Sequence, residues 1–215
     1  MYYVIMKRKS SPAPRKQPRS ATAMPDKLAA SAFALFSARG IGQVSLDDIA
    51  THAGVTKGSF YWHYQSKDDL IKAACAHYYR VYHRRINSEL AHITNPVERL
   101  ARTIETAVNI CLMDRANRVF TTEVFTLAVH NPELGRSWRQ FSDSVREFYL
   151  GLLKAAMAAE DLKTTDPEQA VDFVLSAMEG IKLRAQHEPH LCSKQSKRSI
   201  VTSLKRNLGI IETEQ

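Results

Sequence analysis

The segment from Thr56 to Tyr64 combines basic and aromatic side chains in a way that suits nucleic-acid binding. Thr56 is a candidate helix N-cap, and the string KGSFYWHY follows it. In a helix, Phe60 and Tyr64 share the buried face at i, i+4. The other face then presents Lys57, Tyr61, Trp62 and His63. Exposing this much aromatic surface beside a basic group is costly for a solvated helix, so the face is predicted to bind a partner.

A second short helix is predicted directly before this segment. Ser45 can cap its N-terminus, and Asp48, three residues later, supplies a weaker form of the capping box. Its apolar face is formed by Leu46, Ile49, Ala50 and Ala53. The helix ends at Gly54, and the pair joined at Ala53-Gly54-Val55 forms a helix-turn-helix. In this motif the first helix crosses the DNA backbone and the second enters the major groove.

Helical spacing of apolar residues continues through the rest of the chain. A helix from Pro25 to Gly40 precedes the two short ones, with Leu28, Ala32, Leu35 and Phe36 on one face. Further helices are predicted over Lys67 to about Ile93, Val97 to Met113, Asn117 to Val129, Glu133 to Ala159, Pro167 to Gln186, and Lys194 to Leu208. No segment alternates with period two for long enough to be a strand, so the predicted fold is all-α.

Much of the excess positive charge lies in residues 1–24. The chain has 215 residues and a formal net charge of +8. Six basic residues precede the first acid, Asp26: Lys7, Arg8, Lys9, Arg15, Lys16 and Arg19. Because the segment is rich in Ser and Pro, a disordered arm is predicted. Such an arm either contacts DNA phosphates or only keeps the protein soluble, and composition does not separate the two.

The cysteines and the hydropathy favour a reducing cytoplasm with no membrane partner. Cys75, Cys111 and Cys192 form no CxxC pair, and no run of eighteen apolar residues could span a bilayer. His187 and His190 lie near Cys192, which raises the question of a metal site. Their spacings match no standard zinc pattern, so an inter-helix loop is the preferred interpretation, and neither a metal nor a cofactor is predicted.

The string AFALFSARGIGQVSLDDIATHAGVTKGSFYWHYQSKDDL, from Ala32 to Leu70, resembles the TetR family of bacterial transcriptional regulators. The matching positions are Phe36, Gly40, Ser45, Ile49, Ala50, Ala53, Gly54, Val55, the run Thr56 to Tyr61, His63, Tyr64, Ser66 and Lys67. Tyr64 stands where the family usually has Phe or another apolar residue, so room is needed for a hydroxyl. The resemblance covers about Pro25 to Ala74, a quarter of the chain.

The resemblance implies DNA contacts from both helices of the motif. Phosphate contacts are expected from Ser45, Ser59, Tyr61, His63 and Lys67. Base contacts are expected from Thr56, Lys57, Gly58 and Trp62, with Lys57 donating to guanine and Trp62 packing on a thymine methyl. Other interpretations remain open: Ser45 as a cap only, Gly58 as a packing accommodation, and His63 as a partly buried neighbour. Phe60 and Ile49 are predicted to be core.

The resemblance also implies a DNA-binding domain over residues 25–70 and a ligand-binding and dimerisation domain over 71–215. In the family the last two helices pair with their copies in a second subunit as a four-helix bundle. The candidate stripes are Val171, Val174, Leu175, Met178 and Ile181, and then Ile200, Val201, Leu204 and Leu208. The small residues Ala177 and Gly180 would allow close approach of a partner helix.

A small-molecule effector is expected among the middle helices. Aromatic, soft and polar residues there are candidates, although most will be ordinary core: Met113, Phe120, Glu123, Phe125, His130, Trp138, Phe141, Tyr149 and Met157. The apolar character of the set suggests a largely hydrophobic molecule with one polar group near Glu123 or His130.

Together these features predict a sequence-specific transcriptional regulator, a homodimeric repressor released from an operator in double-stranded DNA by its effector. One alternative is an architectural DNA-binding protein without an effector. An enzyme is the other, but the chain has no GxSxG, P-loop or HExxH motif. The glycines of Gly40-Ile41-Gly42 lack the third glycine and the preceding strand of a dinucleotide site.

Overall fold

The computed structural model describes residues 23–159, 162, 164 and 166–210, and every regular element among them is helical. The elements are α1 (Ala23–Arg39), η1 (Ile41–Gln43), α2 (Leu46–His52), α3 (Lys57–His63), α4 (Lys67–Leu90), α5 (Pro96–Val108), η2 (Asn109–Met113), α6 (Arg115–Ala128), α7 (Pro132–Ala159), α8 (Pro167–Arg184), η3 (Pro189–Cys192) and α9 (Lys194–Asn207). The all-α prediction is confirmed. The basic arm lies almost wholly outside the described residues.

Side-chain caps explain why most helices begin close to where the sequence predicts. The Ser45 hydroxyl accepts a hydrogen bond from the Asp48 amide at 3.1 Å, and the Asp48 carboxylate accepts one from the Ser45 amide at 2.9 Å. These two bonds form a capping box and satisfy N–H groups that the first turn of α2 leaves free. They also hold the pKa of the Asp48 carboxyl below its usual value. The N-cap residues of the other helices with a side-chain cap are Thr56, Ser66, Asn95, Asp114, Asp166 and Ser193.

Two predicted helix ends differ from the structure by three or more residues. Helix α4 stops at Leu90 instead of Ile93, because the Arg99 guanidinium donates hydrogen bonds to two carbonyls of the turn, Leu90 O at 2.9 Å and Ile93 O at 2.8 Å. Helix α5 stops at Val108, and the chain continues as η2, a π-helical turn. Single π-turns inside helical segments are common at functional sites.

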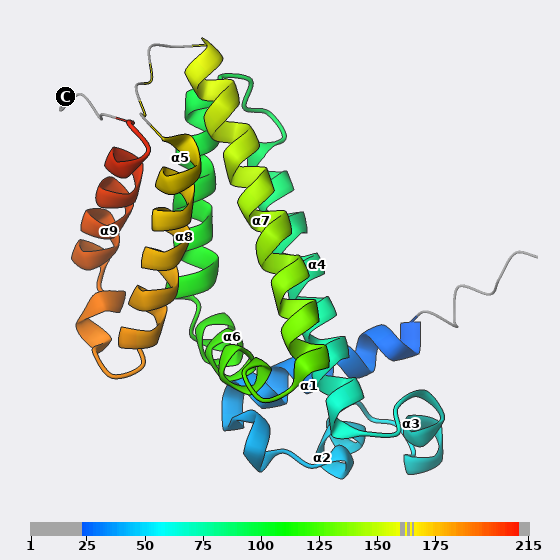
Figure 1. Ribbon diagram of the computed structural model, residues 1–215. Helices are drawn as coiled ribbons and strands as arrows, with labels where there is room; N and C mark the ends of the chain where they lie inside the picture. Colours follow the sequence, from blue (N-terminus) through cyan, green and yellow to red (C-terminus); the bar gives the residue numbers. More distant parts are fainter. Residues whose placement is uncertain (1–22, 160–161, 163, 165, 211–215) are drawn as a thin grey trace, which may run out of the picture.

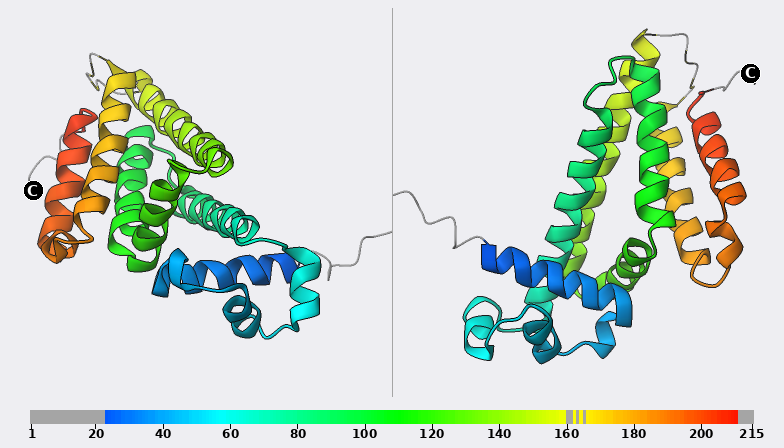
Figure 2. Two further views of the ribbon diagram at one scale, coloured as in Figure 1. Left: turned by 60° about the horizontal axis from the view of Figure 1, so that its bottom comes forward. Right: turned by 180° about the vertical axis from the view of Figure 1, so that it is seen from behind.

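The helices of the motif, α1 to α3, occupy one end of the molecule (Figure 1). Helices α4 and α7 extend away from that end, and α8 and α9 lie side by side with α5 behind them (Figures 1 and 2). Helix α6 lies between the two parts and packs against α1, α4, α7 and α8. Its Phe120 ring is 4.9 Å from that of Phe33 on α1, so one apolar core runs through both parts. None of the described helices is both long and apolar enough to cross a membrane.

A carboxylate on α6 is hydrogen-bonded to the loop that leads into the helix-turn-helix. Glu123 Oε2 accepts a hydrogen bond from the Ile41 amide at 2.5 Å. The preceding residue, Gly40, has φ 87°, and a Cβ added there would lie 2.9 Å from Glu123 Oε1. Gly40 is thus needed both for its left-handed backbone and for the close approach of Glu123.

A second polar connection lies at the turn between α6 and α7. Asn131 Nδ2 donates to Asp68 at 3.2 Å, and the Lys72 ammonium lies 3.0 Å from the Glu133 carboxylate. Asp68 and Lys72 are in the first turns of α4, next to Lys67. The end of the molecule that carries α1 to α3 and the start of α4 is therefore bonded to α6, and to the turn after α6, at two separate places.

Gly40→Ala is expected to destabilise the protein by about 1–3 kcal/mol, because the added methyl group meets both an unfavourable backbone conformation and the Glu123 carboxylate. Gly42→Ala is the control, since a Cβ there has no neighbour within 4 Å. Urea unfolding at one protein concentration measures both variants. Equal stabilities of the two would contradict the role given to Gly40.

Candidate nucleic-acid interface and ligand cavity

Helix α3 exposes a large apolar side chain at the surface of the molecule. Trp62 is 81% exposed and Tyr61 is 45% exposed, whereas Phe60 between them and the core is fully buried. The Trp62 ring stands perpendicular to the His63 ring, with 4.6 Å between their centroids. Phe60 and Ile49 are core residues, as predicted. The Trp62 side chain is not packed into the core of this chain. An exposed apolar ring of this size indicates a surface that binds a partner.

Lys57 points along the same surface and is held by an acid of the preceding helix. Its ammonium lies 2.6 Å from the Asp47 carboxylate, and both side chains are more than half exposed. The hydrogen bond that Lys57 donates to Asp47 raises the pKa of Lys57. Because exposed ion pairs contribute little stability, a stronger acceptor can replace Asp47 without a large penalty.

The small and polar residues of the motif have distinct surroundings. Thr56 caps α3 by accepting a hydrogen bond from the Ser59 amide at 3.2 Å, and the Ser45 hydroxyl is engaged in the box described above. A Cβ on Gly58 would meet no atom within 4 Å. Packing inside the protein therefore does not require glycine at 58.

Two residues flank α3 and tie it to its neighbours. The Tyr64 hydroxyl donates to the Pro25 carbonyl at 3.4 Å, so the fold has room and a partner for this hydroxyl. The Lys67 ammonium donates to the Gly42 carbonyl at 3.4 Å, and the residue is half-buried beside the motif. His63 is half-buried against Trp62.

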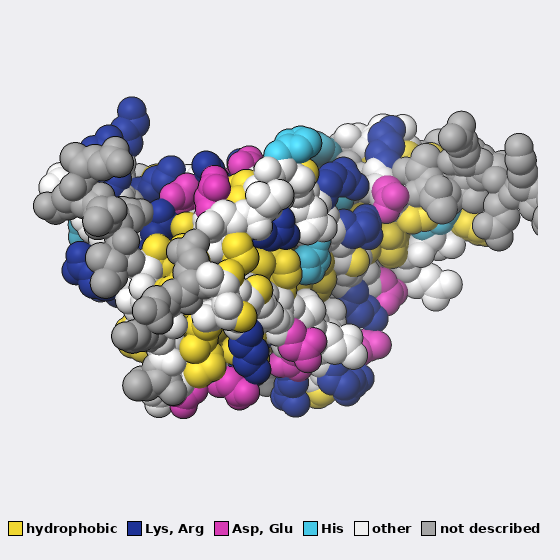
Figure 3. Space-filling model, turned by 90° about the horizontal axis from the view of Figure 1, so that it is seen from above, with side chains coloured by type: hydrophobic (Ala, Val, Ile, Leu, Met, Phe, Trp, Pro, Cys, Tyr) yellow, Lys and Arg dark blue, Asp and Glu magenta, His cyan; other side chains and the backbone are white. Residues whose placement is uncertain are grey.

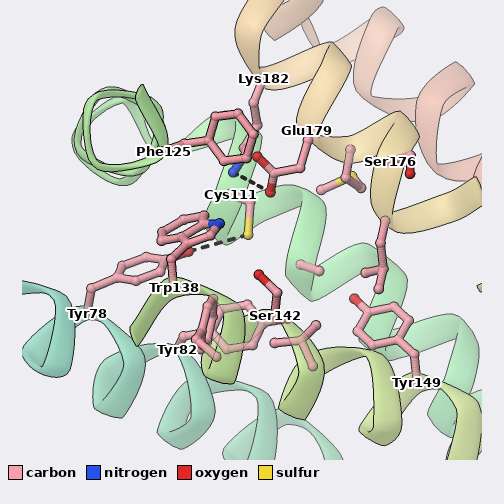
Figure 4. Close-up of a pocket in the computed structure, with 15 residues that line it drawn as sticks. Tyr78, Tyr82, Cys111, Phe125, Trp138, Ser142, Tyr149, Ser176, Glu179 and Lys182 are labelled. Atoms are coloured by element: carbon pink, nitrogen blue, oxygen red, sulfur yellow. Dashed lines mark hydrogen bonds and ion pairs between the residues drawn. The ribbon is translucent and has the colours of Figure 1, made fainter. Parts of the chain in front are cut away.

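A cavity of about 220 Å³ lies between α4, α6, α7, α8 and the end of α5 (Figure 4). Its aromatic lining consists of Tyr78, Tyr82, Phe125, Trp138, Phe141 and Tyr149. Phe125 is half exposed, and its ring centroid lies 6.2 Å from that of Trp138. Mostly apolar walls with a few polar groups are typical of a small-molecule site.

The polar groups of the cavity come mainly from α8. Lys182 lies 2.8 Å from Glu179 and also donates to the Thr121 hydroxyl of α6 at 3.3 Å. The Tyr78 hydroxyl lies 3.7 Å from the Cys111 sulfur. Burial raises the pKa values of both groups, so both remain protonated at neutral pH.

The structure brings four of the predicted ligand residues together around this cavity: Phe125, Trp138, Phe141 and Tyr149. It places the others elsewhere. Phe120 is core against α1, Glu123 binds Ile41, His130 lies exposed in the turn before α7, and Met113 and Met157 are outside the lining.

Sequence reasoning missed Tyr78, Tyr82, Cys111, Glu179 and Lys182, which also line the cavity. The position of Lys182 in the sequence could have indicated a buried polar site. Lys182 continues the apolar stripe of α8 one turn after Met178, and a lysine at such a position must have a buried partner. The tyrosines of α4 gave no such indication, because nothing in their spacing distinguishes a cavity wall from ordinary core.

The apolar stripes assigned to a partner subunit pack largely inside the protomer. Six of these side chains are buried: Val171, Val174, Met178, Val201, Leu204 and Leu208. Leu175, Ile181 and Ile200 are half-buried. These six belong to the protomer's own core, so a partner helix could reach only the outward faces of α8 and α9. Apolar side chains do reach the surface between charged ones at the end opposite the motif (Figure 3).

The segment with His187, His190 and Cys192 lies between α8 and α9, and Pro189–Cys192 form the 3-10 helix η3. Glu188 is bonded there to Arg184 at 2.6 Å and lies 3.9 Å from His190. Among the described residues, no group of three or more His, Cys, Asp or Glu side chains could hold a metal ion.

A helix-turn-helix with an exposed aromatic and basic second helix, on an all-helical scaffold, defines a DNA-binding transcriptional regulator. Residues 28–74 match the family described as bacterial regulatory proteins, tetR family, and residues 96–208 match the C-terminal region of BetI-type transcriptional repressors. The chain therefore belongs to the TetR family of transcriptional regulators, with a BetI-type C-terminal region. This family assignment confirms the predicted regulator and excludes the enzyme alternative.

Individual relatives agree with the assignment. The chain is 27% identical over 155 residues to the HTH-type transcriptional repressor BepR of Brucella suis, covering 68% of this chain and 72% of that protein. Over 40 residues it is 50% identical to the regulator AcrR of Shigella flexneri, covering 19% of each chain. A regulator from Saccharomonospora viridis, solved in complex with choline, has the same fold, with a TM-score of 0.77 at 18% identity, covering 86% of this chain and 96% of that one.

Trp62→Ala is expected to weaken binding to a selected operator by about 1–3 kcal/mol per half-site and to relax base preference at one position. Val129→Ala is the matched control, because Val129 is 71% exposed but lies outside the motif. Gel-shift titration with operator and with random DNA measures both. If Trp62→Ala bound both DNAs as the unchanged protein does, α3 would not be the reading helix.

Proposed function

We propose that the chain is a homodimeric repressor that leaves its operator when a small molecule binds in the aromatic cavity. The observation that carries this proposal is the position of α6, which contacts both the cavity and the helix-turn-helix. Ser45, Ser59, Tyr61, His63 and Lys67 then bind phosphates. Thr56, Lys57, Gly58 and Trp62 read the bases.

Three residues in one five-residue stretch of α6 contact different parts of the molecule. Phe125 lines the cavity, Thr121 accepts a hydrogen bond from Lys182 of the cavity, and Glu123 accepts one from Ile41 at the start of the motif. A displacement of α6 by a ligand therefore acts directly on the Ile41 amide. The effect does not require a longer path through the core.

The DNA geometry makes a small displacement sufficient. In a dimer, two recognition helices must meet half-sites about 34–36 Å apart, so a tilt of either motif misplaces both. A ligand that favours the DNA-free form by about 1–3 kcal/mol lowers operator affinity by 5- to 150-fold. Reciprocity requires that DNA weakens ligand binding by the same factor.

The relatives support the two parts of this proposal. BepR is named a repressor, and the regulator from Saccharomonospora viridis was crystallised with choline. They favour repression and a small organic effector for this chain. The direct test is selection of DNA from a random pool by the purified protein. A two-fold symmetric site supports the proposal, and equal recovery of all sequences would support an architectural DNA-binding protein instead.

The outward face of α8 is the proposed dimer contact. Phe173, Ala177 and Gly180 follow each other at i, i+4, i+7 on that face, and Phe173 is 57% exposed. The adjacent helix α9 adds Ser199, Ser203 and half-buried Ile200. A face of small residues with one exposed aromatic ring suits the close packing of two helix pairs.

Gly180→Arg is expected to abolish the dimer, because the long side chain would stand where the partner helix packs. The protomer has room for it, since a Cβ on Gly180 meets nothing within 4 Å. Gly151→Arg on α7 is the control, with the same open surroundings. Sedimentation velocity should show a monomer for the first variant and a dimer for the second; a dimer for both would move the interface elsewhere.

Glu123→Ala is expected to weaken operator binding by about fivefold to tenfold, because the motif is no longer held in its DNA-binding orientation. Glu123→Gln should retain most of the affinity, since an amide oxygen can still accept from Ile41. Glu147→Ala, at an exposed position of α7, is the control. Fluorescence anisotropy with labelled operator measures all three, and an unchanged Glu123→Ala variant would contradict the role of α6.

A further inference from the structure

The cavity contains one ion pair, and its two partners differ sharply in exposure. The side chain of Lys182 is 4% exposed, whereas that of Glu179 is 47% exposed. Lys182 is also bonded to Thr121, so its ammonium is fixed inside the protein. Glu179 can turn towards solvent and be hydrated there. The pair is neutral as a whole, but its buried member is the cation and its half-exposed member is the anion, so a second anion can replace Glu179 beside Lys182.

We propose that the ligand of this cavity is an organic anion, a carboxylate or similar group on a small aromatic or branched apolar body, which binds Lys182 in place of Glu179. This inference rests on the proposed function and adds the chemical class of the effector. The apolar body packs among the aromatic side chains, and the acid reaches the α8 side of the cavity.

The cost of leaving a buried charge without its partner selects the anion. When a ligand carboxylate replaces Glu179, Lys182 keeps both an opposite charge and its bond to Thr121. A cationic ligand would instead occupy Glu179. Lys182 would then be left with the Thr121 hydroxyl, 3.3 Å away, as its one remaining partner among the described residues. Leaving the buried Lys182 charge without an opposite charge is costly, so this outcome is disfavoured.

Neutral groups of the lining also favour a ligand rich in acceptors. The indole N–H of Trp138 can only donate, and within the described part of the chain it has no hydrogen-bond acceptor. Ser142 and Ser176 add hydroxyls at the edge (Figure 4). Aromatic faces attract cations as well, but a cation here would lie beside the fixed charge of Lys182.

The volume limits the size of the ligand. At 220 Å³, the cavity has the space of about seven water molecules. One ring with a short acidic chain fits this space, with the half-exposed Phe125 at the edge able to move for a larger body.

Three probes with the same ring and chain separate charge from shape: 4-phenylbutyrate, 4-phenylbutanol and 4-phenylbutylamine. Calorimetric titration of the full chain without DNA should show the acid binding about tenfold tighter than the alcohol, with the amine weakest. Lys182→Met should abolish the preference for the acid. Lys154→Met, at an exposed position of α7, should preserve it.

Glu179→Gln distinguishes an anion site from a cation site without removing the buried lysine. This variant remains informative if Lys182→Met does not fold. An anion site predicts tighter binding of the acid, because the competing carboxylate is gone. A cation site predicts weaker binding of the amine. Tightest binding of the amine, equal binding of the three probes, or binding of none would overturn the proposal. If the acid binds as expected but leaves operator affinity unchanged, the ligand class stands and the proposed function fails.

Discussion

The hydrogen bond from the Ile41 amide to Glu123 is the constraint on which the arrangement of the two parts depends. At 2.5 Å it joins a carboxylate of α6 to the first residue after Gly40. Hydrogen bonds to charged acceptors are about twice as strong as neutral ones, and the left-handed Gly40 lets the two backbones approach closely enough to form it. The loop entering α2 thus takes its position from α6.

Because Glu123 is on α6, this hydrogen bond connects the helix that lines the cavity to the loop before α2. Thr121 and Phe125 flank Glu123 on the same helix and face the cavity groups. The lining of the cavity comes from α4, α5, α6, α7 and α8 and from the π-turn η2, and under the proposed function a ligand that fills the cavity shifts α6 between α1 and α8. The Asn131–Asp68 contact adds a second connection, at the start of α4 beside Lys67. Under the proposed function, these few polar bonds and the shared apolar core couple the cavity to the motif.

The sequence was most informative where the structure is local. Caps such as Ser45, Thr56 and Ser66 bond within three residues, so their side chains fix helix starts that a pattern can locate. The exposure of Trp62 and burial of Phe60 follow from helical spacing alone. The cavity could not be found this way, because it depends on which faces of α4, α6, α7 and α8 meet. Glu123 shows the limit clearly: its type suggested a ligand contact, whereas its partner lies 82 residues away in the chain.

The apolar stripes of α8 and α9 show the same limit of sequence analysis. Periodicity identifies the face that must be buried, but it does not say whether the partner is the same chain or another. Val171 and Leu204 pack inside the protomer, and the face left outside is formed by small residues around Phe173. Small side chains give no hydropathy signal, although they are what close packing of two helix pairs needs.

Residue-resolved amide exchange at Ile41, with and without selected operator DNA, tests the central claim most directly. If the bond to Glu123 holds the motif in its DNA-binding orientation, operator binding must stabilise that bond, and the Ile41 amide will exchange more slowly in the complex than in the free protein. An Ile41 exchange rate that is unchanged or faster on operator binding would contradict the account.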